Sequence, residues 1–462
     1  MTITVRFAPS PTGSLHIGGA RTALFNYYFA KSQKGKILLR IEDTDRERST
    51  EDAVDAIFKG LDWLGVEYDG EPLFQFERMQ RHAEIAEELV KRGTAYYCYM
   101  SAEEMDAERA KAEAEGSIWH YDRRWRDRDP SEAPQGVKPT IRIKAPIGDG
   151  ALTLHDAAQG DVTVKHEQLD DFILLRSDGT PTYMLAVVVD DHDMGVTHVL
   201  RGDDHLNNMF RQYVIYDGMG WDFPVHAHIP LIHGEDGKKL SKRKNAAAVE
   251  EYRDMGYLPE AMRNYLLRLG WSHGDDEIIS DDQAIEWFDL DHIGKSPSQL
   301  DFAKLNHVNH HYIKLKDNNE LFDIAKPFIE KEIGTINPIV KQRIINGMNG
   351  LKDRSQTLVE LAKNARFYQS VSIDDGAKAK LEQEHAPQVL HDALDIARGL
   401  NDWNGKSFID SVLTKTGMKM GQVGPVLRAA LAGTMQSPDL TEIITALGQD
   451  EVKTRLQAAM TA

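Results

Sequence analysis

The sequence predicts a mixed α/β protein with an inserted α+β segment and an all-α C-terminal third. Short apolar strands alternate with amphipathic helices over residues 3–64, which is typical of parallel βαβ units. From about residue 80 charged helices and a tyrosine-rich strand interrupt this alternation. Beyond about residue 245 nearly all apolar patterns have helical spacing. These observations give the expected order of parts along the 462 residues.

The first part holds a strand, a proline-stiffened turn and a helix start. Alternating apolar residues predict a strand over 3–7 that ends before Pro9, and apolar spacing near 3.6 predicts a helix from Ile17. Three residues lie at the start of that helix: His16, Gly18 and Gly19. Free N–H groups and the positive dipole end favour phosphate there, and glycine allows close approach. We interpret the stretch as a nucleotide site, although an isolated His-x-Gly-Gly is more often a simple corner.

An acidic segment follows the next predicted strand. The apolar run 36–41 is typical of a buried parallel strand, and it ends in Glu42-Asp-Thr-Asp45. Since open α/β sheets bind ligands at the carboxyl ends of their strands, this edge should face the same crevice as His16. For Asp43 and Asp45 a solvated loop and a functional role carry equal weight. Ser49-Thr-Glu-Asp52 predicts a capping box that opens the next helix.

The interrupting segment is predicted as helix 81–92, strand 95–99, helix 102–115 and strand 138–144. Between them, residues 122–129 carry four arginines that could touch RNA phosphates. Three interleaved aspartates favour a self-neutralised surface loop instead.

Three later segments are predicted as buried strands: 171–176, 183–192 and 197–205. The last one has a charged C-terminal end. Residues 234–244 then form a cationic, glycine-flanked loop, a pattern that is usually a solvated surface run.

Bulk composition indicates a cytoplasmic protein with no membrane association. It is 41% hydrophobic and 28% charged, without a run of eighteen apolar residues or a secretory signal. Its single cysteine, Cys98, excludes an internal disulfide. The net charge of −18 would by itself argue against a nucleic-acid partner. It does not exclude one, because phosphate contacts depend on local positive patches and not on the total charge.

Two separated motifs carry a family resemblance. Residues 6–21 read Arg-Phe-Ala-Pro-Ser-Pro-Thr-Gly-Ser-Leu-His-Ile-Gly-Gly-Ala-Arg, and residues 239–243 read Lys-Leu-Ser-Lys-Arg. The pair resembles the HIGH and KMSKS signatures of class I aminoacyl-tRNA synthetases, and the longer motif resembles bacterial glutamyl-tRNA synthetases in particular. The resemblance covers nearly the whole chain, and residues 419–433 with Ser437-Pro-Asp-Leu440 resemble the anticodon-binding end of that family.

The resemblance implies a Rossmann-like class I synthetase catalytic domain with an inserted α+β domain, followed by an all-α anticodon-binding module. The implied boundaries are 1–80 and 181–235 for the catalytic domain, 81–180 for the inserted acceptor-end-binding domain, 236–315 for the KMSKS loop and stem-contact region, and 316–372 and 373–462 for two helical anticodon-binding subdomains.

The activity implied by the resemblance is glutamate–tRNA ligation. L-glutamate and ATP would form glutamyl-adenylate and pyrophosphate, and the glutamyl group would pass to the 3′ end of tRNA(Glu), with tRNA(Gln) left open as a second acceptor. Mg²⁺ should arrive bound to ATP. We expect a monomer. The implied residues are His16 and Lys242 for catalysis; His16, Gly18, Gly19, Lys239, Ser241, Lys242 and Arg243 for ATP; and Arg6, Ala8, Ser10, Glu42, Tyr183 and Arg201 for glutamate.

The residue types suit these roles. Arginines such as Arg6 and Arg201 can bind carboxylates in a planar bidentate way, and Glu42 suits an ammonium; which arginine takes the γ-carboxylate stays open. Lys242 could neutralise charge that develops on the phosphates in the transition state. His205 stands where some family members carry Trp, which leaves its role open.

A zinc site occurs in the insertion of some family members. Cys98 offers one thiol where that site has two, and Trp125 stands near the place of a third ligand. We therefore expect no structural zinc.

Alternatives remain within and outside the family. Glutaminyl-tRNA synthetases have a different lead-in to the first motif and β-barrels in place of the C-terminal helices, and the helical third excludes a short paralogue. A non-catalytic RNA-binding relic should have lost His16, the 239–243 motif or the arginines. By resemblance, Arg354 is the candidate tRNA-binding residue at the third anticodon base, although an exposed arginine paired with Asp353 or Glu360 is at least as probable.

Overall fold

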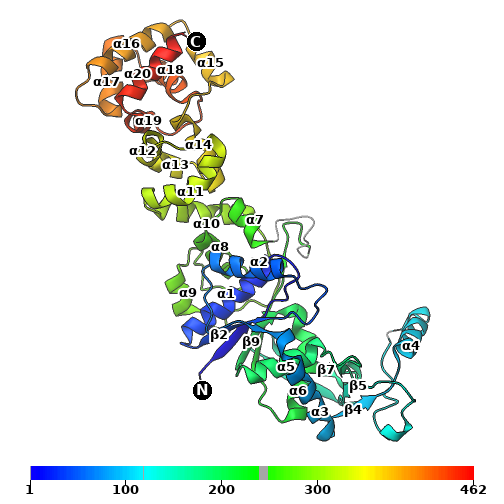
Figure 1. Ribbon diagram of the computed structural model, residues 1–462. Helices are drawn as coiled ribbons and strands as arrows, with labels where there is room; N and C mark the ends of the chain where they lie inside the picture. Colours follow the sequence, from blue (N-terminus) through cyan, green and yellow to red (C-terminus); the bar gives the residue numbers. More distant parts are fainter. Residues whose placement is uncertain (1, 118, 239–247, 462) are drawn as a thin grey trace. The chain divides into compact units, whose positions relative to one another are not determined.

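The computed structural model describes residues 2–117, 119–238 and 248–461, and the chain divides into two compact units (Figure 1). The first unit contains Met1–Glu251 and Arg263–Asp301, and the second contains Tyr252–Met262 and Phe302–Ala462. Each unit is therefore built from two stretches of chain.

A parallel sheet opens the first unit. Its strands, in order, are β1 (Thr4–Phe7), β2 (Lys36–Ile41) and β3 (Leu73–Phe74). Helix α1 (Ile17–Ser32) connects β1 to β2, and α2 (Glu51–Trp63) connects β2 to β3. Ile37, Leu39 and Ile41 of β2 are buried, so the βαβ pattern is as the sequence predicts.

A second sheet continues beside the first. Its order is β7 (Gly160–Lys165), β6 (Ala151–Asp156), β10 (Val225–Ile229) and β9 (His198–Gly202). Strands β9, β10 and β6 run parallel, while β6 and β7 form an antiparallel hairpin. The amide of Thr197 donates to the carbonyl of Thr4 at 2.9 Å, which joins β9 to β1. The β6–β7 hairpin is not foreseen by the sequence-based interpretation.

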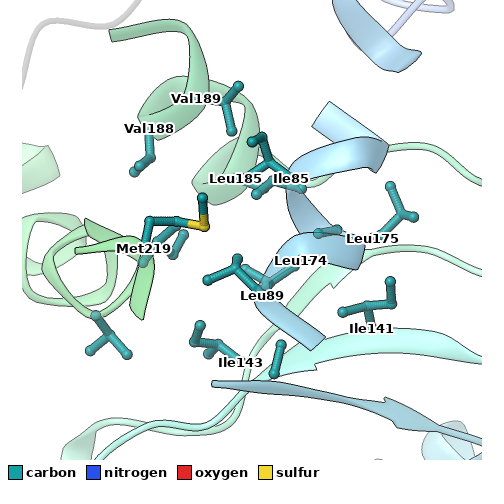
Figure 2. Close-up of a cluster of buried hydrophobic side chains, with 14 of the residues drawn as sticks. Ile85, Leu89, Ile141, Ile143, Leu174, Leu175, Leu185, Val188, Val189 and Met219 are labelled. Atoms are coloured by element: carbon teal, nitrogen blue, oxygen red, sulfur yellow. The ribbon is translucent and has the colours of Figure 1, made fainter. Parts of the chain in front are cut away.

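The insertion has its own antiparallel sheet, with the order β4 (Ala95–Cys98), β5 (Thr140–Ile143) and β8 (Ile173–Leu175). Helices α3 (Met79–Lys91), α5 (Tyr183–Asp193) and α6 (Leu206–Met219) pack around it. Figure 2 shows this core, in which Leu89 of α3 lies beside Leu174 of the sheet and Ile85 of α3 lies beside Leu185 of α5. The antiparallel sheet of the insertion and helices α3, α5 and α6 thus share one apolar core.

The prediction of a strand over 183–192 is wrong, because these residues form α5. All residues from Leu185 to Asp191 are buried, so no polar face marks the helical period. Three consecutive valines also resemble a strand. The predicted capping box is wrong as well: the N-cap of α2 is Thr50, whose Oγ1 accepts from Ala53 N at 3.2 Å.

The remaining elements of residues 1–301 are short. They are α4 (Ala102–Ala114), α7 (Val249–Asp254), α8 (Pro259–Arg268), α9 (Asp281–Trp287), β11 (Ile232–His233) and β12 (Ser298–Gln299), with 3₁₀ turns at Gln75–Arg78, Pro130–Glu132, His166–Gln168 and Asp203–His205.

From Phe302 on the described chain is helical, as the sequence predicts. The helices are α10 (Phe302–Leu315), α11 (Asn318–Ile333), α12 (Pro338–Asn346), α13 (Met348–Lys352), α14 (Leu358–Ala365), α15 (Asp375–Leu381), α16 (Ala386–Gly399), α17 (Gly405–Thr416), α18 (Met420–Ala432), α19 (Leu440–Leu447) and α20 (Gln449–Thr461), with a 3₁₀ turn at Arg366–Tyr368. The stretch Tyr252–Met262 is held to α10 by hydrogen bonds, among them Leu258 N to Asn309 Oδ1 at 2.8 Å.

Candidate functional site

A cavity of about 640 Å³ opens where β1, β2 and β9 end and α1 begins. Nine of the predicted site residues line it together: Arg6, Ala8, Ser10, His16, Gly18, Gly19, Glu42, Tyr183 and Arg201. Ligand sites of this kind lie at the carboxyl ends of parallel strands. The two predicted subsites, for nucleotide and for amino acid, therefore belong to one cavity.

His16 caps the helix that faces this cavity. It is the N-cap of α1, with extended backbone, and its Nδ1 accepts from the amide of Gly18 at 3.1 Å. In the neutral ring Nε2 then carries the proton, so His16 presents a donor at this nitrogen. The start of α1 thus combines an imidazole with the positive end of a helix dipole.

Gly18 keeps the backbone of this helix start accessible. Among the residues that the structure describes, a Cβ added there would meet only His16, with Nδ1 at 3.4 Å. The space beside Gly18 consequently belongs to the cavity, which a ligand phosphate can enter.

A buried charge cluster lies on one side of the cavity. Asp191 Oδ1 accepts from Arg6 Nε at 3.0 Å and from Arg40 Nη1 at 2.5 Å. Arg40 Nη2 also donates to Glu42 Oε1 at 3.2 Å. Burial opposes the charged form of Asp191, but the two guanidinium groups outweigh it and hold the pKa of Asp191 at about 2. Asp191 therefore stays ionised and fixes Arg6.

The charge of Glu42 is less well compensated by its neighbours than that of Asp191. Burial raises its pKa, and the guanidinium groups of Arg40 and Arg6 counter this only in part. Only 9% of the Glu42 side chain is exposed, and a carboxylate at the cavity wall whose charge is incompletely balanced suits a cationic ligand group.

Arg201 reaches the cavity from the end of β9. Its Nε donates to His228 Nε2 at 3.0 Å, and its Nη2 donates to the carbonyl of His205 at 3.4 Å. Burial lowers its pKa, but a guanidinium stays charged at physiological pH. Arg201 is thus a buried cation on the cavity wall.

Tyr183 and His205 lie together beside Arg201. Tyr183 Oη and His205 Nδ1 are 3.3 Å apart, and Asn208 Nδ2 lies 3.1 Å from the same nitrogen. Burial raises the pKa of Tyr183 to about 12 and lowers the pKa of His205, so both side chains are neutral near pH 7. His205 therefore takes part in this wall as a neutral polar group.

Taken together, these side chains can bind a ligand with two kinds of charge. Two arginines offer sites for carboxylate or phosphate oxygens, and Glu42 offers one for a cation. Beside them the start of α1 suits a phosphate. The cavity can therefore hold an amino-acid zwitterion next to a nucleotide.

Lys239, Ser241, Lys242 and Arg243 lie outside the described residues. The described chain on both sides of them approaches the cavity. Ile232 lines it, and beyond the gap Ala248 forms a backbone bridge with His16 while Val249 N donates to Leu15 O at 2.9 Å.

Four buried partners of the site are missed by sequence reasoning: Arg40, Asp191, Asp156 and His228. The signal was a charged or titratable residue inside an apolar run, as in Val-Val-Val-Asp-Asp over 187–191. Such residues need a buried partner. Asp43, considered for function, instead accepts from Phe76 N at 2.8 Å and pairs with Arg46.

Arg354 lies in the helical unit and is not part of this cavity. It is exposed ahead of α14 and lines a second hollow of about 510 Å³ with polar neighbours that include His310, Lys363 and Asn364. The expected ion pairs are not found in the described chain, since Asp353 pairs with Lys314 at 2.8 Å and Glu360 accepts from Gln356 N at 2.7 Å.

The donor set around Cys98 does not fit zinc. Cys98 Sγ donates to Tyr121 Oη at 3.3 Å, and the same hydroxyl receives the amide of Trp125 at 3.2 Å. The neighbouring buried side chains are aromatic or methionine. Over residues 2–117, 119–238 and 248–461 no group of three or more His, Cys, Asp or Glu could hold a metal ion. The hydroxyl of Tyr121 thus joins Cys98 of β4 to the backbone of Trp125.

The arginines of the 122–129 cluster contact carboxylates of the chain itself. Arg123 and Arg126 donate to the buried Asp171, and Arg124 donates to Asp122 and Glu108. Of the ion pairs that these arginines make within the described chain, only that of Arg124 with Asp122 uses an aspartate of the cluster itself, so most of the neutralising carboxylates lie outside residues 122–129.

Comparisons with known proteins are consistent along the whole length. Residues 2–307 match the family model described as tRNA synthetases class I (E and Q), catalytic domain, and residues 320–460 match an anticodon binding domain. The chain is 56% identical to glutamate–tRNA ligase 2 of Rhodospirillum centenum over 100% of both chains. It is 54% identical to glutamate–tRNA ligase 2 of Brucella ovis over 98% of both.

Solved structures give the same similarity. The crystal structure of a glutamate tRNA ligase from Elizabethkingia meningosepticum in complex with its amino acid matches with a TM-score of 0.90, 31% identity and full coverage of both chains. Glutamate-tRNA synthetase from Elizabethkingia anophelis matches with a TM-score of 0.87 at 31% identity, again over both full chains. Among the described residues no helix is long and apolar enough to cross a membrane.

Proposed function

The chain belongs to the class I tRNA synthetases of the glutamate and glutamine group, and from this membership we infer that it is a glutamate–tRNA ligase. It uses ATP and glutamate as substrates and tRNA as acceptor. The observation that carries the assignment to the site is the single cavity in which the start of α1 adjoins two arginines and one carboxylate.

The first half-reaction joins glutamate to AMP. A carboxylate oxygen of glutamate attacks the α-phosphorus of ATP, a P–O bond forms, and the bond to pyrophosphate breaks. His16 and the start of α1 hold the phosphates on one side, with Gly18 and Gly19 leaving room for them. Lys242, with Lys239, Ser241 and Arg243, approaches from the other side and stabilises the charge that develops on the leaving pyrophosphate. Ile232 lines the cavity and Ala248 bridges to His16, and these contacts of the described chain before residue 239 and after residue 247 support this arrangement.

Glutamate is oriented by opposite charges. Arg6 and Arg201 bind its carboxylates, and Glu42 binds its ammonium, while Ala8, Ser10 and Tyr183 complete the wall. Glutamine would turn an NH₂ donor toward a guanidinium that is itself only a donor, so it is rejected. Mg²⁺ enters with ATP and is held mainly by phosphate oxygens.

In the second half-reaction a ribose hydroxyl at the 3′ end of tRNA attacks the glutamyl carbonyl, and AMP leaves. The helical unit binds the anticodon region, with Arg354 at its polar hollow. We propose a cytoplasmic monomer, and tRNA(Gln) is a second acceptor to be tested.

Isotope exchange between pyrophosphate and ATP tests the proposal. We expect exchange that requires glutamate, measured with and without tRNA, and no exchange with glutamine. Arg201→Ala and Glu42→Gln should raise the glutamate KM while the ATP KM, measured in the same variants, stays near the wild-type value. Absence of exchange under all conditions would indicate an RNA-binding relic, and exchange with glutamine would indicate a glutaminyl enzyme. Aminoacylation of purified tRNA(Glu) and tRNA(Gln) then determines the acceptor range.

A further inference from the structure

Behind Arg201 lies a line of buried polar side chains across three neighbouring strands. Arg201 on β9 lies directly opposite His228 on β10, and β6 brings Asp156 to the far side of β10. Asp156 and His228 have no exposed surface, and Arg201 is 6% exposed. Asp156 is in register with His226, two residues before His228 on the same face of β10, and hydrogen bonds join Asp156, His228 and Arg201 into a row that ends at the cavity.

The hydrogen bonds in this row have fixed directions. A guanidinium can only donate, so His228 Nε2 must accept from Arg201 Nε at 3.0 Å. The proton of the ring is then on Nδ1, which donates to Asp156 Oδ2 at 2.6 Å. Burial lowers the pKa of His228, which agrees with a neutral ring. The tautomer of His228 is thus set by Asp156.

Asp156 is itself locked in place. Its Oδ1 accepts from the amides of Ala158, Gln159 and His228 at 2.8–3.2 Å. These three donors favour the carboxylate, and together with the His228 side chain they lower its pKa despite burial. Only Oδ2 remains to orient His228.

This row leaves the outer end of Arg201 for a ligand. Its Nη1 is buried and has no hydrogen-bond partner within the described chain, and its Nη2 makes only a 3.4 Å contact with the carbonyl of His205. Arg6, in contrast, donates directly to the carboxylate of Asp191. Interposing a neutral imidazole keeps the anion of Asp156 away from Arg201, so more of the positive charge of Arg201 is offered to the cavity.

We propose that Asp156 and His228 are positioning residues for substrate recognition: they hold Arg201 by its Nε and present its Nη1 and Nη2 to a carboxylate of glutamate. This inference rests on the proposed role of Arg201 in the amino-acid pocket. A carboxylate that is bound end-on by two nitrogens requires a guanidinium plane of fixed orientation. His228, which Asp156 orients, fixes this plane by accepting from Arg201 Nε.

Two amide substitutions of His228 distinguish its hydrogen bond with Arg201 from its hydrogen bond with Asp156. Gln at position 228 can offer its oxygen where Nε2 lies, whereas Asn can reach only the Nδ1 side and leaves Arg201 Nε without an acceptor. We expect His228→Asn to raise the glutamate KM on the order of tenfold, and His228→Gln to raise it less than about threefold. The ATP KM and kcat should change less than about threefold in both. Equal effects of the two variants on the glutamate KM, or no effect of either, would overturn the inference.

Asp156→Asn supplies a second test that keeps the shape of the site. Three backbone donors should hold the amide oxygen at the Oδ1 position, so the NH₂ group faces His228 Nδ1. The ring must then carry its proton on Nε2, which points a donor at Arg201. We expect a raised glutamate KM that the second change His228→Gln lowers again. A double variant no better than Asp156→Asn would count against the tautomer argument, and thermal unfolding of each variant identifies any that fail to fold.

The same assays with Arg201→Ala separate the inference from the proposed function. If Arg201→Ala leaves the glutamate KM unchanged, the assignment of the pocket itself is wrong. If Arg201→Ala raises it but His228→Asn does not, the pocket stands and only the positioning role fails.

Discussion

Arg6 and Arg201 reach the same cavity but differ in what balances their charge. Arg6 shares the carboxylate of Asp191 with Arg40, whereas Arg201 contacts a neutral imidazole. Burial disfavours the charged form of Glu42, and the hydrogen bond from Arg40 favours it. Residue types alone predict that these side chains meet a charged ligand, but the buried partners that tune them come from strands and helices distant in sequence.

The carboxyl of Glu42 should give the pH profile a characteristic acid limb. Because burial raises its pKa above the ordinary value of about 4.3, the charge that binds the ammonium is lost at a higher pH than for an exposed carboxyl. We expect kcat/KM for glutamate to fall as the pH is lowered toward that pKa, since this ratio reports groups of the free enzyme. In the Glu42→Gln enzyme kcat/KM should be low and should lack this limb. An identical limb in both enzymes would mean that another group titrates there.

Lys242 should act mainly in the transition state. Its charge is needed most when pyrophosphate leaves, so Lys242→Ala should lower kcat by about two orders of magnitude or more and change the ATP KM little. Lys244→Ala removes the same charge just outside the motif and should have a small effect. Weakened ATP binding with normal kcat would contradict this role of Lys242.

The start of α1 is the element on which the nucleotide part of the site depends. The sequence predicts its position well because Pro9, Gly13 and the apolar spacing from Ile17 are local signals. Helix α5 is mispredicted for the opposite reason, since a helix buried on all sides has no polar face. The pairing of β6 with β10 is not predicted, because β10 lies about 70 residues later and no local pattern reveals that pairing.

Gly18→Ala should separate ligand binding from helix stability. Alanine favours a helix over glycine by up to about 1 kcal/mol, and within the described part of the chain its methyl group meets only His16, at 3.4 Å. The free energy of unfolding should therefore stay equal or rise, while the ATP KM increases several-fold because the methyl group occupies the phosphate space. Gly421→Ala, at the start of α18 with no atom near the added Cβ, is the matched control and should leave the ATP KM unchanged. A Gly18→Ala enzyme with normal ATP kinetics would show that phosphates do not approach this helix start.

Asp171 should be the residue on which the insertion most depends. It is fully buried and accepts from Tyr96, Arg123, Arg126 and Ala145. Removing it takes the carboxylate partner from two partly exposed guanidinium groups and leaves the hydroxyl of Tyr96 without its acceptor, so Asp171→Ala should lower the free energy of unfolding by about 2–3 kcal/mol in denaturant titration. Asp170→Ala removes a neighbouring, partly exposed carboxylate and should cost less than about 1 kcal/mol. Similar losses for both would show that the buried network is not a main source of stability.

For the whole molecule, a net charge of −18 has to be reconciled with an RNA partner. The composition gives the wrong expectation taken alone, while the two motifs and the helical third give the right family, as the full-length matches confirm. The domain boundaries and the roles of single residues stay predictions, because they depend on tertiary contacts and on bound substrates that no local pattern encodes.

Selectivity between tRNAs should depend on Arg354 if it reads a base. A base-edge contact is worth roughly 1–3 kcal/mol, so Arg354→Gln should change the ratio of the charging rates of tRNA(Glu) and tRNA(Gln) by about tenfold. Lys363→Gln in the same hollow should lower both rates equally, as loss of a phosphate contact would. If Arg354→Gln affects both tRNAs equally, or neither, Arg354 is not the discriminating residue.

The division of the chain has a consequence for modular exchange. The helical unit includes Tyr252–Met262, a stretch that precedes the last part of the first unit, and its residues Tyr252, Leu258 and Met262 are fully buried. A shortened gene that stops at Asp301 would still encode this stretch but none of the helices that cover it. An anticodon module can therefore not be grafted at a single junction: a functional chimera must take both stretches from the same parent, so recombination between relatives should preserve them as a linked pair.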